Sequence, residues 1–86
     1  MRWTYLGGGS WELQGGPYLG CMYGDKMDPT EAHRVRLERW DGHQQRWVTH
    51  GEERTVVGFS ASQRALVEMY ESTLRCDLAR LARVEP

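Results

Sequence analysis

The chain has 86 residues, 40% of them hydrophobic, and its 12 acidic and 11 basic side chains give a formal net charge of −1 at pH 7. This length corresponds to one small domain that hides about 60–65% of the surface exposed by its unfolded form, and the apolar fraction excludes wholesale disorder. The near-neutral charge provides no overall attraction to nucleic acid or to an acidic membrane, and no apolar run approaches the roughly 20 residues of a membrane helix.

The first half of the chain has the alternating pattern of β-strands. RWTYL (2–6), WELQ (11–14) and YLGCMY (18–23) each alternate between two faces, and glycine-rich stretches separate them. Period-two alternation with aromatic enrichment and glycine punctuation is typical of strands joined by turns. We therefore predict three strands in this region.

The segment DKMDPTEA (25–32) connects these strands to the next element. Asp28, Pro29 and Glu31 fit the N-cap, first-turn and third positions of a helix. Beyond them, Val35 and Leu37 alternate as in a strand and continue no helical face. We expect one helical turn at most, followed by a strand.

The stretch HRVRLERWDGHQQRWVTH (33–50) has the signature of a β-hairpin. Its Asp41-Gly42 dipeptide lies between two alternating runs, which is the strongest short-range hairpin signal. A further strand is predicted in RTVVGF (54–59).

The sequence leaves two registers open for this hairpin. A two-residue turn would pair Trp40 with His43, whereas a three-residue loop over residues 40–42 would pair Val35 with Trp47. Burial decides sheet register, and the second choice places the apolar residues of both strands on one face. We therefore predict the three-residue loop.

From Ser60 onward the apolar period changes to three and four residues, which is typical of a helix. Ser60 and Gln63 fit a capping box at its start. One stripe runs along the helix and contains a single charged residue, Asp77. The stripe is formed by Leu66, Met69, Tyr70, Thr73, Leu74, Asp77, Leu78 and Leu81.

Several strands followed by one long helix predict an α+β fold. We expect a single domain over residues 1–86, with a β-rich part in residues 1–59 and a C-terminal helix in residues 60–84. The small antiparallel sheet, of about four to five strands, is expected to pack against the helix with one face.

The residues provide no constellation for catalysis or metal binding. His33, His43 and His50 are ten and seven residues apart, whereas zinc ligands usually come in pairs separated by about two to five residues. No serine or cysteine lies in a nucleophile motif. We therefore expect no metal, no cofactor and no enzymatic activity, and a small enzyme or metal protein is the disfavoured alternative.

Cys21 and Cys76 lie far apart in the sequence and either form one disulfide or remain free. The first residues, MRWTYLGGG, lack the apolar core of a secretory signal. We therefore expect a cytoplasmic location and two free thiols. The initial methionine and the helical end are those expected of a complete small open reading frame.

The predicted hairpin is also the candidate binding site. Its four arginines and two carboxylates give a net charge of +2, whereas the rest of the chain nets −3. Trp40 is expected to be exposed near the turn, and exposed tryptophan beside arginine is typical of protein interfaces. The same composition suits stacking on unpaired bases, and a merely solvated strand face is the simplest alternative. The candidate contact residues are Arg36, Arg39, Trp40 and Arg46.

These features predict a small non-enzymatic binding module that acts by protein–protein interaction. Small stand-alone proteins of this kind are often inhibitors, antitoxins or adaptors, including those of phages and mobile elements. The alternative is a single-stranded nucleic-acid-binding protein that uses the arginine/tryptophan hairpin. Another protein is the preferred partner because the net charge is small for phosphate-driven affinity.

The end of the predicted helix favours a homodimer. Residues 61–84 would rise about 36 Å at about 1.5 Å per residue, whereas a compact domain of this length has a diameter of about 30 Å. A small sheet would leave the end of the apolar stripe uncovered, and a second copy of the helix would cover Leu74, Leu78 and Leu81. Fraying after about residue 78, or cover from the N-terminal strand, would remove the need for a partner.

Overall fold

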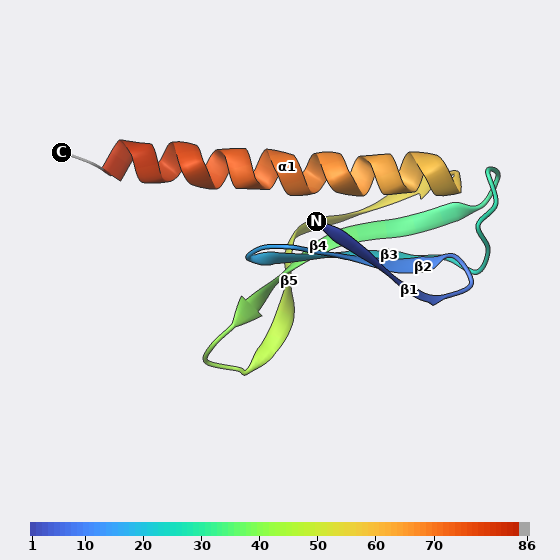
Figure 1. Ribbon diagram of the computed structural model, residues 1–86, viewed down its shortest axis with the longest axis horizontal. Helices are drawn as coiled ribbons and strands as arrows, with labels where there is room; N and C mark the ends of the chain where they lie inside the picture. Colours follow the sequence, from blue (N-terminus) through green and yellow to red (C-terminus); the bar gives the residue numbers. More distant parts are fainter. Residues whose placement is uncertain (85–86) are drawn as a thin grey trace.

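The computed structural model describes residues 1–84, which form five β-strands followed by one α-helix. The strands are β1 (Arg2–Gly7), β2 (Ser10–Gln14), β3 (Tyr18–Tyr23), β4 (Ala32–Asp41) and β5 (Arg46–Val57), and the helix is α1 (Phe59–Val84). The strands form one antiparallel sheet in the order β1-β2-β3-β4-β5, and α1 lies across one face of it (Figure 1). The predicted α+β class, with a small antiparallel sheet and a C-terminal helix, is confirmed.

The core lies between α1 and the sheet. Its buried apolar side chains alternate along the strands and recur at helical spacing in α1. They are Leu13, Tyr18, Met22, Val35, Leu37, Leu66 and Tyr70. Gly20 lies beneath the helix, where a Cβ atom would be 3.0 Å from Leu13 Cβ and 3.2 Å from the side chain of Leu66. Glycine at this position therefore lets the helix approach the sheet closely.

The β4–β5 hairpin does not have the predicted register. Trp40 pairs with Trp47, and the loop between the strands has four residues, 42–45. Its left-handed residue is Gln45, with φ 57°. The three-residue loop was wrong because Asp41 Oδ1 accepts hydrogen bonds from two loop amides, those of residues 43 and 44, at 2.9 and 3.1 Å. A side chain that caps its own loop in this way stabilises the longer connection.

β5 is one continuous strand where the sequence predicts two. His50 pairs with Leu37 and Arg54 pairs with Val35. The two pairs are four residues apart along β5 and two residues apart along β4, so β5 contains a bulge. This bulge contains Gly51 at φ 82°, a conformation that favours glycine. It keeps apolar and polar side chains on their proper faces on both sides of the irregularity.

The helix begins one residue before the predicted start. Gly58, with φ 100°, accepts a hydrogen bond from Ser62 N at 2.9 Å, and α1 begins at the next residue. The predicted capping box at Ser60 is wrong because Ser60 already lies within the helix. The carbonyl of Asp28 accepts a hydrogen bond from Phe59 N at 3.2 Å, so the connector before β4 holds the helix start. That connector forms a turn and no helix, which agrees with the expectation of one helical turn at most.

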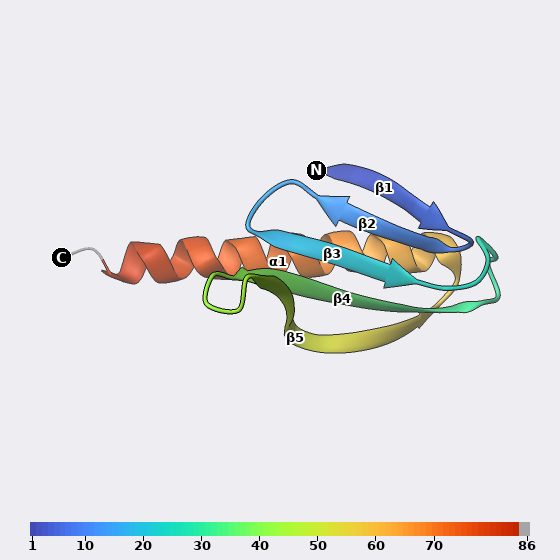
Figure 2. The same cartoon turned by 90° about the horizontal axis from the view of Figure 1, so that it is seen from below.

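The C-terminal part of α1 projects beyond the sheet (Figure 2). The molecule measures 50 × 26 × 21 Å along its principal axes, with a Cα radius of gyration of 14.1 Å. The overhang expected from the length of the helix is therefore present. Within the described residues, no helix combines the length and apolarity needed to cross a membrane.

Candidate binding surface

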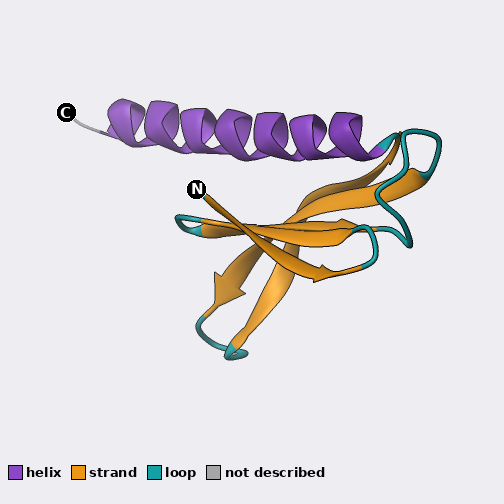
Figure 3. Ribbon diagram, turned by 45° about the vertical axis from the view of Figure 1, so that its right-hand side comes forward, coloured by secondary structure: helices purple, strands orange, loops and turns teal. Residues whose placement is uncertain are grey.

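The outer end of the β4–β5 hairpin bends away from the helix and projects from the sheet (Figure 3). Trp40 and Trp47 face each other across the two strands at this end, with ring centroids 5.8 Å apart and planes at 72°. They are 49% and 39% exposed. We call these two residues the tryptophan pair. Such an edge-to-face pair stiffens the hairpin while leaving much of both rings open to a partner.

Alternation along β4 explains why Trp40 is accessible. Val35 and Leu37 point to the helix and are buried, so Arg36, Glu38 and Trp40 lie on the face that the helix leaves uncovered. The prediction that Trp40 is exposed is confirmed.

The structure brings only some of the predicted contact residues together. Arg36 lies on the face of the sheet away from the helix. Its Nε donates a hydrogen bond to Glu38 at 3.1 Å, and its Nη1 donates one to Glu53 at 3.2 Å. Its guanidinium is 5.1 Å from the centroid of the Tyr23 ring. These contacts tie Arg36 to the sheet and leave it partly buried. It is therefore a poor candidate for a free contact residue.

The other two predicted arginines flank the tryptophan pair in sequence. Arg39 precedes Trp40 and Arg46 precedes Trp47, and both arginine residues are exposed. Arg46 Nε donates to Gln44 Oε1 at 2.7 Å within the loop. By alternation, both arginines point to the opposite side of the hairpin from the tryptophan pair. The hairpin end thus has an aromatic side and a basic side.

Trp47 is the contact residue that the sequence misplaces, because the predicted register puts it in the core. It lines a groove of about 380 Å³ that runs to the turn between β2 and β3 and also contains Glu12, Gln14 and Leu19. The signal that identifies it is Asp41, since an aspartate that caps a four-residue loop places Trp47 opposite Trp40.

The histidines are spread over three different environments. His33 is fully buried, with Nε2 2.8 Å from the carbonyl of Lys26 and Nδ1 3.1 Å from that of Glu31. His43 is exposed in the hairpin loop, and the His50 ring packs on Tyr18 with centroids 4.9 Å apart. Over the described part of the chain, no three histidine, cysteine or carboxylate side chains form a group suited to a metal ion.

Asp77, the charged residue in the apolar stripe of the helix, has a structural partner. Tyr18 OH donates a hydrogen bond to Asp77 Oδ2 at 2.5 Å and joins the helix to β3. This hydrogen bond and burial raise the pKa of Tyr18 above its usual range. The interruption of the stripe therefore marks a polar contact between helix and sheet.

Both cysteines are free, as predicted. Cys21 is fully buried on the side of β3 away from the helix, and Cys76 is exposed on α1. Burial in the first place, and Glu38 in the second, raise the pKa of Cys21 to about 11. A thiol with such a pKa remains protonated at neutral pH and is a poor nucleophile.

The three leucines predicted for a dimer interface differ in exposure. Leu74 is half-buried against the core, whereas Leu78 and Leu81, farther along α1, are each 66% exposed. The helix continues to Val84, so it does not fray after residue 78. Because both leucines remain exposed, the N-terminal strand does not cover them either.

The chain matches no family model, and no curated protein or solved structure is significantly similar to it. The function is therefore inferred from the chemistry of the surface. One feature of that surface is the tryptophan pair on a projecting hairpin.

Proposed function

We propose that the protein is a non-enzymatic binding module that contacts another protein through the tryptophan pair at the end of the β4–β5 hairpin. The observation that supports this proposal is the exposure of the two rings, 49% and 39%, on a face that the helix does not cover. Tryptophan is enriched among the residues that dominate binding energy at protein interfaces. The free thiols suit a reducing compartment, and we place the protein in the cytoplasm.

The exposed rings offer a substantial part of the free energy that a specific contact needs. A tryptophan side chain has about 250 Å² of surface, so covering the exposed part of one ring removes about 100 Å² from water and contributes roughly 2–3 kcal/mol. The paired rings hold each other in place, so little side-chain freedom is lost on binding. The groove beside Trp47 offers room for a partner side chain next to the rings.

Trp40→Ala is expected to weaken the partner complex by about 2 kcal/mol, or roughly 30-fold in Kd, while the fold is retained. Trp47→Ala is expected to have a similar effect because each ring supports the other. The partner is captured from the source cell with wild-type protein, and its affinity for each variant is then measured by calorimetry. Leu6→Ala is the matched control, since Leu6 is 47% exposed on the opposite edge of the sheet.

Two results would argue against this proposal. Unchanged partner affinity together with a clear drop in the melting temperature of Trp40→Ala would show that the ring supports the fold alone. Binding of a labelled single-stranded oligonucleotide at tens of micromolar, with a steep loss of affinity as salt rises, would assign the hairpin to nucleic acid.

We further propose that the protein forms a homodimer through the projecting end of α1. Burying Leu78 and Leu81 against a second copy would contribute roughly 2 kcal/mol for each side chain, and two-fold dimers are the commonest assemblies. Both leucines, less than one helical turn apart near the C-terminal end of α1, are 66% exposed.

Leu81→Glu is expected to shift the dimer to monomer in sedimentation equilibrium, because it places a charge in the apolar contact. Ser60→Glu introduces the same charge at an exposed position near the start of the helix and should leave the dimer intact. A wild type that stays monomeric at high micromolar concentration would refute the dimer. A dimer unaffected by Leu81→Glu would assign the contact to another surface.

A further inference from the structure

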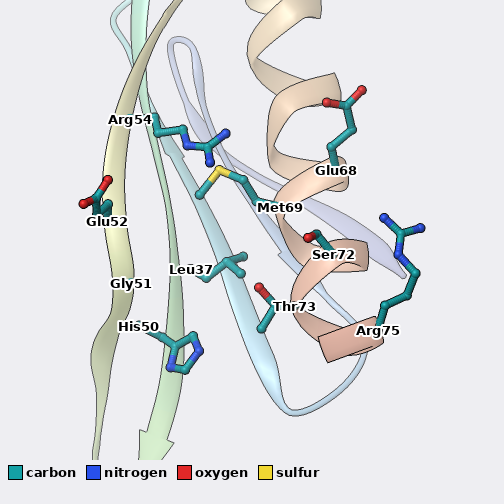
Figure 4. A pocket seen from close by; sticks show the side chains of 10 residues that line it. All are labelled: Leu37, His50, Gly51, Glu52, Arg54, Glu68, Met69, Ser72, Thr73 and Arg75. Atoms are coloured by element: carbon teal, nitrogen blue, oxygen red, sulfur yellow. The ribbon is translucent and has the colours of Figure 1, made fainter. Parts of the chain in front are cut away.

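A groove of about 560 Å³ lies between the edge strand β5 and the helix α1, on the side of the sheet away from the tryptophan pair (Figure 4). Its base contains Leu37 from β4 and Met69 from α1. Its volume falls within the range of about 300–1,000 Å³ that is usual for small-molecule sites.

The bulge in β5 directs positively charged and hydrogen-bonding groups into this groove. His50 and Arg54 pair with helix-facing residues of β4, and both extend toward α1, whereas Glu52 points to the other side of the strand. Bulges often reorient side chains next to functional sites. β5 thus directs a guanidinium and an imidazole into the groove, whereas Glu52 also lines it but extends its carboxylate away from α1.

Arg54 differs from the neighbouring arginines of the sheet in its partners. Arg34 and Arg36 form ion pairs with Glu53, and Arg36 also pairs with Glu38, on the face away from the helix. Within the described residues, no ion pair involves Arg54. Its guanidinium is therefore available to an anion that enters the groove.

The helix supplies hydroxyl groups on the other wall. Ser72 and Thr73 line the groove opposite β5, and Thr73 points toward the sheet (Figure 4). A guanidinium binds carboxylate and phosphate oxygens in a bidentate manner, and hydroxyls donate to the remaining oxygens. Glu68 and Arg75 on the helix carry opposite charges, as Glu52 and Arg54 on β5 do, so the lining as a whole is balanced. The preference for an anion comes from orientation, because Arg54 extends into the groove and Glu52 does not (Figure 4).

We infer that this groove binds a small organic oxyanion. Its phosphate or carboxylate head group contacts Arg54, with His50 and Thr73 beside it, and its apolar part lies on Leu37 and Met69. This site is independent of the tryptophan pair, so the protein carries a small-ligand site in addition to its proposed protein contact.

The test is a titration of 15N-labelled full-length protein with phenyl phosphate, phenylacetate and inorganic phosphate, followed by NMR. Phenyl phosphate or phenylacetate is expected to shift the amides of residues 50–54 and 69–75 and to saturate with a Kd of about 1 mM or below. Inorganic phosphate should bind at least tenfold more weakly because it lacks the apolar part. The tighter of the two aromatic ligands identifies the head group as phosphate or carboxylate.

Arg54→Gln is expected to lower the affinity at least tenfold, because the bidentate contact is lost. Arg64→Gln, at an exposed helix position outside the groove, should bind as the wild type does. The inference is refuted if none of the three ligands produces saturable shifts in these segments, or if Arg54→Gln binds with unchanged affinity. Neither result depends on the tryptophan pair, whose partner binding is measured separately.

Discussion

Gly24→Ala is expected to destabilise the fold by about 3 kcal/mol, because a methyl group at this position would overlap a buried side chain that cannot move. A Cβ atom on Gly24 would collide with the imidazole ring of His33, which is fully buried. The ring lies between the carbonyls of Lys26 and Glu31, at 2.8 and 3.1 Å from its two nitrogens. Displacing it would break the contacts of the ring with these carbonyls, and Gly9 closes the space on another side.

The control and the rescue for this substitution are both available in the chain. Gly42→Ala should have little effect, since no atom lies within 4 Å of the added Cβ. The double variant Gly24→Ala/His33→Ala should be less destabilised than the sum of the two single variants, because removing the ring removes the collision. Urea denaturation measures the free energy of unfolding of the wild type and of these four variants. A Gly24→Ala variant as stable as Gly42→Ala would show that the ring has room to move.

The second large effect is a loss of stability in alkaline solution that depends on Cys21. Burial raises the pKa of this thiol from 9.0 to about 11, so the folded state holds its proton more tightly than the unfolded state does. The stabilisation is complete below pH 9 and is lost as pH rises through 11. The free energy of unfolding should fall by about 1 kcal/mol by pH 10 and by roughly 2–3 kcal/mol above pH 11.

Two variants separate the thiol from the other alkaline groups. Tyr18 and Tyr23 also have raised pKa values, but they start from 10.0 and reduce stability at higher pH than Cys21 does. Urea unfolding at pH 8, 9 and 10 should therefore show the slope in wild type and in Cys76→Ala, whose thiol is exposed. Cys21→Ala should lack most of it. An equal slope in Cys21→Ala and wild type would assign the effect to other groups.

Local periodicity was enough to predict most of the architecture. The strands at residues 2–6, 11–14 and 18–23 and the helix at residues 60–84 agree with β1, β2, β3 and α1 to within one residue at every end. Short connections between consecutive strands favour neighbouring antiparallel pairs, which is the order observed. The exposure of Trp40 followed from the same alternation, because period two decides which residues of one strand share a face.

The tertiary structure alone decided how one strand aligns with the next and what each polar exception contacts. Asp41 caps a longer loop, and the register of that loop moves Trp47 from the predicted core to the surface beside Trp40. The bulge at Gly51 inserts extra residues farther along β5. In the sequence, Asp77 only interrupts the apolar stripe of the helix. In the structure it accepts a hydrogen bond from Tyr18, which lies 59 residues earlier in the chain. Periodicity within a segment is local, whereas register and polar pairing depend on atoms that only folding brings together.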